Sequence, residues 1–202
     1  MKKKKEALRI IAKKLKGIPW AIFAGTAVEI YTKGKRVGND IDIIIPEDKI
    51  DEVAQKFNVI PILETRRKDG VELINDYYIE TNIKGIPVEF VGKTKKTVID
   101  GKEYKSPKDL KQELFKRVKK KKYLGIDVFV VPIEEVLVQK MLFHRSEKWQ
   151  DEEDVKLLLK TGDINKKNLT WAFNLWGISK KKQKSFKLRS FFKNRVREKW
   201  QR

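Results

Sequence analysis

The sequence contains no cysteine and only one histidine in 202 residues. Without cysteine there are no disulfides, thiolate nucleophiles or Cys-type zinc sites, and one histidine excludes His-cluster metal sites and argues against a Ser-His-Asp triad. No run approaches the roughly 18 consecutive apolar residues of a membrane span, so we expect a soluble protein. Lys2–Lys5 are not followed by the long apolar segment of a secretory signal, so we expect the protein to be cytoplasmic. Chemistry must then use carboxylates, lysines and backbone groups.

The net charge is +20, and it is concentrated at the two ends of the chain. Residues 1–16 hold eight Lys or Arg and one Glu, and residues 163–202 hold thirteen Lys or Arg and two acids. Basic ends on a nearly neutral body are typical of a polyanion-binding protein. Heat adaptation is the competing interpretation, because lysine- and glutamate-rich surfaces are common in thermophile proteins. It accounts for the abundance of lysine but not for its segregation.

We therefore predict that the basic ends bind RNA. In the C-terminal segment, Leu188, Phe192, Val196 and Trp200 recur every four residues, which predicts a helix with one apolar stripe and a cationic surface. The side chains expected to contact RNA are Lys2, Lys3, Lys4, Lys5, Lys180, Lys181, Lys182, Arg189, Arg195 and Arg197.

The order of apolar runs predicts an α/β (α+β) fold, with a mixed sheet flanked by helices and a helical region after it. We expect a head over residues 1–131, which begins with a basic helix over residues 2–16, and a helical region over residues 132–202. Within the head, residues 40–45 are predicted to form a β-branched strand. Ser106-Pro107 predicts the start of a helix that continues to about residue 120.

Two acids alternate with isoleucines in Asp40-Ile41-Asp42-Ile43. Because side chains alternate along a strand, Asp40 and Asp42 should project from the same face. Like charges at close range repel, and a hard divalent cation with oxygen ligands, such as Mg²⁺, relieves that repulsion. Taken alone, such a pair more often consists of solvated turn or edge-strand acids.

Gly25-Thr26 lies between a short apolar run and a segment suited to a helix, thirteen residues before the acids. A glycine lets a phosphate approach the backbone, the helix N-terminus presents free N–H groups, and Thr26 adds a hydroxyl. A phosphate-binding turn next to paired acids favours chemistry on a nucleotide.

Together, Ala24-Gly25-Thr26 and Asp40-Ile41-Asp42-Ile43 resemble the signature of the nucleotidyltransferase superfamily, which has a polymerase beta-like fold. A second stretch, Val131 to Lys140, is similar to the AbiEii-type branch, which includes toxin-like enzymes of toxin–antitoxin systems. That similarity continues through Arg145, Lys148, Asp151 and Asp154. The resemblance covers about residues 17–162, so the basic ends lie outside it.

The resemblance implies a third acid on a later strand, which completes a two-metal site. Glu89 is the candidate because it is the only acid inside an apolar strand after the pair, and Asp76 and Glu80 on the preceding strand are its rivals. Asp40, Asp42 and Glu89 are thus the predicted catalytic residues and Mg²⁺ ligands. Glu89 could also accept the proton of the acceptor hydroxyl.

Lys140 falls on the apolar face of the helix expected after Pro132, where an unpaired ammonium is costly. A nucleotide phosphate could be its partner, as the resemblance also implies. A lysine that snorkels to water at the edge of the face is an equal alternative. Asp151 and Asp154, three residues apart, could instead hold Lys140, Arg145 or Lys148 in place.

These features predict a Mg²⁺-dependent nucleotidyltransferase that binds a nucleoside triphosphate through Gly25, Thr26 and Lys140. It would transfer a nucleoside monophosphate to an acceptor hydroxyl, for which an RNA 3′ end is preferred. One alternative is a non-catalytic RNA-binding protein with the same fold. Another is an enzyme that modifies a protein or a small molecule.

Overall fold

A computed structural model describes residues 1–68, 71–99, 101–105, 110–142, 149–180 and 183. Strands and helices follow one another as a mixed α/β structure, as the sequence predicts. The strands are β1 (Ala21–Ile22), β2 (Ile41–Ile44), β3 (Ile62–Lys68), β4 (Val71–Ile83), β5 (Ile86–Ile99), β6 (Lys102–Lys105), β7 (Lys119–Tyr123) and β8 (Ile126–Val130). The helices are α1 (Lys2–Lys14), α2 (Ala24–Tyr31), the 3₁₀ turn η1 (Glu47–Lys49), α3 (Ile50–Phe57), α4 (Leu110–Phe115), α5 (Ile133–Leu142), α6 (Trp149–Lys160) and α7 (Lys166–Leu175).

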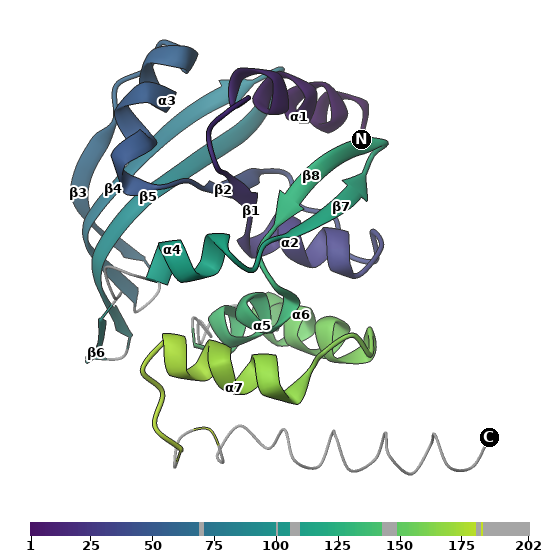
Figure 1. Cartoon of the computed structure of the whole chain (residues 1–202), viewed down its shortest axis with the longest axis vertical. Helices are drawn as coiled ribbons and strands as arrows, with labels where there is room; N and C mark the ends of the chain where they lie inside the picture. Colours follow the sequence, from purple (N-terminus) through teal and green to yellow (C-terminus); the bar gives the residue numbers. More distant parts are fainter. Residues whose placement is uncertain (69–70, 100, 106–109, 143–148, 181–182, 184–202) are drawn as a thin grey trace.

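Within the described residues the strands form one mixed sheet of eight, in the order β3-β4-β5-β2-β1-β8-β7, with β6 paired to β5. The β2–β5 and β1–β8 pairs are parallel, and the other pairs are antiparallel. The long strands β4 and β5 extend well beyond the short central strands β1 and β2 (Figure 1). Because β1 and β2 are antiparallel, the end of β1, which leads into α2, lies beside the beginning of β2.

The central strands β1 and β2 consist mainly of apolar residues, which are buried because helices cover both faces of the sheet. Phe90 of β5 packs against Phe57 of α3, with ring centroids 4.8 Å apart. Side chains alternate along a strand, so Glu89, the neighbour of Phe90, points to the opposite face. On that side of β2 lies α2, which also packs against α5. The polar positions of β2 and β5 therefore face the α2–α5 side of the sheet.

Two sequence-based element boundaries are wrong. The strand predicted over residues 40–45 is Ile41–Ile44, and Asp40 lies in a bend before it. The helix predicted to reach residue 120 is limited, in the described residues, to Leu110–Phe115. Lys119–Tyr123 form an edge strand instead, because a tight turn at Leu124 and Gly125, both with positive φ, pairs this segment with β8.

The α5, α6 and α7 helices pack together beneath the sheet (Figure 1). Contacts also join α5 to α2, so this helical layer meets the sheet at the helix whose first turn contains Gly25 and Thr26. The division into a head and a helical region at residue 131 stays a prediction. No described helix has the length and apolar character needed to cross a membrane.

Candidate active site

Asp42 and Glu89 lie side by side on neighbouring parallel strands. The register of β2 and β5 pairs these two residues directly, so their side chains project from the same face of the sheet. On the other side of Glu89, the antiparallel register of β4 places Glu80 opposite it. The sheet therefore carries a row of three acids, in which Glu89, the predicted third acid, is central.

Asp40 adds its charge to this cluster from the bend before β2. Burial, and after it the negative charges of Asp40 and Glu89, raise the pKa of Asp42 to about 7. The charge of Lys140 and a backbone hydrogen bond from Gly25 act in the opposite direction. The three predicted acids, Lys140 and the Gly25 backbone are thus close enough to affect one carboxyl group.

The Gly25-Thr26 turn forms the first turn of α2, and it touches the acids directly. Ala24, where the helix begins, has φ of 49°, a left-handed conformation that is uncommon for a residue other than glycine. This bend aims the Gly25 N–H at the Asp42 carboxylate. The buried Thr26 hydroxyl donates a hydrogen bond to the Asp40 carbonyl at 2.8 Å. Thr26 therefore holds the backbone of an acid, and its direct contact with a phosphate stays a prediction.

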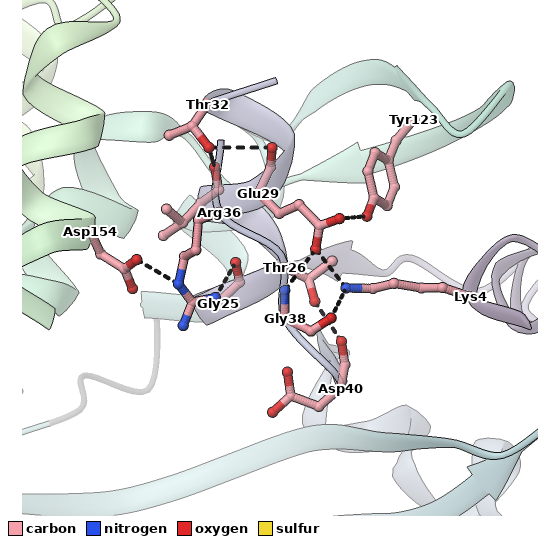
Figure 2. Close-up of polar contacts among 11 residues, drawn as sticks. Lys4, Gly25, Thr26, Glu29, Thr32, Arg36, Gly38, Asp40, Tyr123 and Asp154 are labelled. Carbon is pink, nitrogen blue, oxygen red and sulfur yellow. Dashed lines mark hydrogen bonds and ion pairs between the residues drawn. The ribbon is translucent and has the colours of Figure 1, made fainter. Parts of the chain in front are cut away.

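A buried polar network fixes the loop between α2 and β2 (Figure 2). The Lys4 ammonium donates to Glu29 at 2.7 Å and to the Gly38 carbonyl at 3.1 Å. Tyr123 also donates to Glu29, and the same carboxylate accepts from the Gly38 N–H at 3.1 Å. Since Gly38 lies two residues before Asp40, α1, α2 and β7 together set the position of that acid.

This network corrects one RNA-binding prediction. Lys4 is 4% exposed and is paired with Glu29, so it cannot be one of the lysines that contact RNA. Its neighbours Lys2 and Lys3 are exposed. The pattern of four successive lysines concealed this difference, because Lys4 lies on the same helix face as the buried Leu8 and Ile11.

Lys140 is bound by the two acids that the sequence suggested. Its ammonium lies 2.7 Å from Asp151 Oδ1 and 2.9 Å from Asp154 Oδ2. These pairs join α5 to α6 and hold the lysine beside Asp42, whose pKa it lowers. Arg145, Lys148 and His144 lie outside the described residues.

Two arginines that sequence reasoning missed complete the site. Arg36, from the loop before Asp40, pairs through Nε with Asp154 Oδ1 at 2.6 Å and donates through Nη1 to the Gly25 carbonyl at 3.3 Å. Arg66 of β3 donates from its two terminal nitrogens to the two carboxylate oxygens of Glu89, each at 2.9 Å. For Arg36, the signals in the sequence are its charge and its position four residues before Asp40. For Arg66, the charge is the only signal.

Asp76 and Glu80, the two rivals of Glu89, differ in their contacts with Arg66. It pairs with the fully buried Asp76 and lies 3.9 Å from the exposed Glu80, and its guanidinium stacks on the Tyr78 ring. Asp76 is thus enclosed by the long strands β3 and β4, whereas Glu80 faces solvent. Glu89 is the acid that the register places next to Asp42.

The donor set fits a hard divalent cation in its chemistry. Carboxylate oxygens are the ligands that Mg²⁺ prefers, and the negative charges of Asp40 and Glu89 both act on the Asp42 carboxyl group. Among the described residues, however, no group of three or more His, Asp or Glu side chains is arranged as a metal site. Arg66 supplies a reason, since it engages both oxygens of Glu89. A carboxylate offers about four lone-pair sites, so Glu89 retains positions for a metal.

Exposed lysines gather on the elements next to this network. Every residue of Lys119–Lys122 on the edge strand β7 is exposed, and α1 packs against the adjoining strand β8. Lys180 is exposed as well. Of the other residues predicted to bind RNA, Lys181, Lys182, Arg189, Arg195 and Arg197 lie outside the described residues.

Comparison with solved structures identifies the fold. The chain is similar to a Thermotoga maritima protein described as a candidate nucleotidyltransferase, with 22% identity over 76% of this chain and 90% of that one, at a TM-score of 0.51. It is also similar to the antibiotic-resistance factor ANT(2″)-Ia, with 9% identity, 95% and 96% coverage, and a TM-score of 0.52.

A third similar structure is a nucleotidyltransferase-like protein from Paracoccidioides brasiliensis, with 16% identity, 95% and 91% coverage, and a TM-score of 0.50. No protein-family model and no curated protein matches the chain. The chain therefore has the nucleotidyltransferase fold, and its placement in the AbiEii-type branch stays a prediction.

Proposed function

We propose that this protein is a nucleotidyltransferase that moves a nucleoside monophosphate from a nucleoside triphosphate to an acceptor hydroxyl. The convergence of Asp40, Glu89 and Lys140 on the Asp42 carboxyl group supports this proposal most strongly. The phosphates of a bound triphosphate must be neutralised and aligned. The acids would do so through the Mg²⁺ that they would hold, and the fixed cation Lys140 would do so directly.

In this reaction, the acceptor oxygen attacks the α-phosphorus while the bond to the bridging oxygen of the β-phosphate breaks and pyrophosphate leaves. Glu89 accepts the proton of the attacking hydroxyl. Lys140, fixed by Asp151 and Asp154, contacts the phosphates, and Gly25 lets them approach the start of α2. Asp40, Asp42 and Glu89 would hold Mg²⁺, which would neutralise charge on the triphosphate and on the departing pyrophosphate.

An RNA hydroxyl is the acceptor that the charge distribution favours. The exposed lysines Lys119–Lys122 lie on one edge of the sheet, and Lys2 and Lys3 are exposed on α1. A polyanion gains affinity from each such contact because condensed counterions are released. A small-molecule acceptor would need no comparable basic surface, whereas an acidic protein could also bind to one.

The test is to incubate the protein and Mg²⁺ with each of the four triphosphates in turn, labelled at the α-phosphate, together with total RNA or with cell protein. We expect the label to enter RNA with one triphosphate preferred. Label in cell protein would keep the enzyme and change its acceptor. Binding of RNA without transfer of label from any triphosphate would leave a non-catalytic RNA-binding protein.

A further inference from the structure

Arg36 occupies a position that its salt bridge alone does not explain. The guanidinium lies against the first turn of α2, where a Cβ atom at Gly25 would come within 2.9 Å of its Nη1 atom. A Cβ atom at Gly38 would lie 3.4 Å from the same nitrogen and 3.3 Å from Asp40 Oδ1. The absence of a side chain at Gly25 therefore leaves room for the guanidinium, which lies beside Gly25 and Asp154 (Figure 2).

Asp154 holds Arg36 and Lys140 together as a pair of cations. One of its oxygens binds Arg36 and the other binds Lys140, at 2.6 and 2.9 Å. Asp154 is 1% exposed, whereas the side chains of Arg36 and Lys140 are 17% and 13% exposed. An approaching ligand thus meets the two cations and not the carboxylate behind them.

The known contacts of Arg36 leave part of its donor fork available. Nε binds Asp154 and Nη1 binds the Gly25 carbonyl. Among the described residues, Nη2 has no hydrogen-bond partner. A guanidinium carries five N–H donors in a plane, and its geometry suits bidentate contact with phosphate oxygens.

We propose that Arg36 is a triphosphate-binding residue, which acts with Lys140 as a cationic pair fixed by Asp154 beside the Gly25-Thr26 turn. The inference rests on the proposed function and adds a second phosphate contact to it. Asp154 is the positioning residue of the pair, because each of its oxygens fixes one cation. The alternative is that Arg36 only ties the loop before Asp40 to α6.

The experiment measures the affinity of the full chain for inorganic tripolyphosphate by calorimetry in EDTA, so that neither a base nor a metal contributes. We expect Arg36→Gln to weaken binding at least tenfold. Lys35→Gln, an exposed lysine of the same loop, is the matched control and should bind as the unchanged protein does. If Arg36→Gln bound tripolyphosphate with unchanged affinity, with or without a lower melting temperature, Arg36 would have only a structural role and the inference would be overturned.

Arg36→Gln could fail to fold because it leaves Asp154 buried without one of its cations. Asp154→Asn and the double variant Arg36→Gln with Asp154→Asn avoid that problem. The double variant should bind tripolyphosphate at least tenfold more weakly than Asp154→Asn, and equal affinities would also overturn the inference. If the unchanged protein does not bind tripolyphosphate but still transfers label from a nucleoside triphosphate, the inference fails while the proposed function stands.

Discussion

Arg66 binds both carboxylate oxygens of Glu89 at 2.9 Å, although the two residues lie on strands that are not adjacent in the sheet. The guanidinium reaches from β3 across β4 and also pairs with the buried Asp76. It supplies positive charge at one end of the row of acids, whereas Lys140 supplies it beside Asp42. Cations at both ends explain how the fold tolerates so many carboxylates in one place.

Replacing Arg66 with alanine should destabilise the protein by about 3 kcal/mol, because it leaves Asp76 and Glu89 without their shared cation. Arg67→Ala is the matched control. Arg67 is the next residue on β3, is 73% exposed and pairs with Glu72 at the surface, so its loss should cost less than about 1 kcal/mol. Urea unfolding measures both changes. Equal effects of the two variants would show that the Arg66 network contributes no special stability.

Lys4 and Lys3 offer a second matched pair. Lys4→Ala should destabilise the fold by about 3 kcal/mol, because Glu29 would lose its buried cation. Lys3→Ala, on the exposed side of the same helix, should change the free energy of unfolding by less than about 0.5 kcal/mol. Thermal and urea unfolding test both. A stable Lys4→Ala variant would contradict the network that positions Asp40.

Glu135 of α5 predicts a dependence of stability on pH. Burial raises its pKa to about 7, and its interaction with Trp176 lowers the pKa only in part. Between about pH 4.5 and 7 the folded protein keeps a proton that the unfolded chain releases, so stability falls as pH rises through this window. The contribution is at most about 3 kcal/mol.

Glu135→Gln should therefore lose less stability between pH 5 and pH 8 than the unchanged protein does. The measurement is the free energy of unfolding of both proteins at the two pH values. Parallel losses in the two proteins would mean that Glu135 titrates normally in the folded state.

The lysines of β7 should contribute to the salt dependence of RNA binding. Changing Lys119–Lys122 to glutamine removes up to four phosphate contacts, which should reduce the slope of log K against log salt by about three units for single-stranded RNA. A control of equal charge changes four exposed lysines of α6 and α7, namely Lys156, Lys160, Lys166 and Lys167. If both variants changed the slope equally, RNA binding would not be localised to this edge of the sheet.

The sequence predicts the central part of the site because that part is encoded locally. Asp42 and Glu89 each lie in an apolar strand, and the alternation of polar and apolar residues gives their direction. Lys140 is predicted in a similar way, as a cation on an apolar helix face. The spacing of Asp151 and Asp154 on the next helix leaves Lys140, Arg145 and Lys148 open as their partners, and the structure pairs both acids with Lys140.

The residues that were missed depend on long-range register. Arg66 reaches Glu89 only because β3, β4 and β5 pair in one particular alignment, which no local pattern reveals. The helix predicted to continue to about residue 120 overlaps the first residues of β7, because four lysines in a row carry no apolar period that marks a strand, and the pairing of β7 with β8 decides the outcome. Lysines on an edge strand also prevent further pairing with other chains.

The central claim is nucleotidyl transfer that depends on the paired acids, and the fate of two phosphate labels tests it most directly. With the preferred triphosphate and acceptor, label at the α-phosphate should enter the acceptor and label at the γ-phosphate should leave as pyrophosphate. Asp40→Asn and Asp42→Asn should each abolish both events while circular dichroism shows a folded protein. Transfer of the γ-label to the acceptor, or near-normal transfer of the α-label by either variant, would contradict the account.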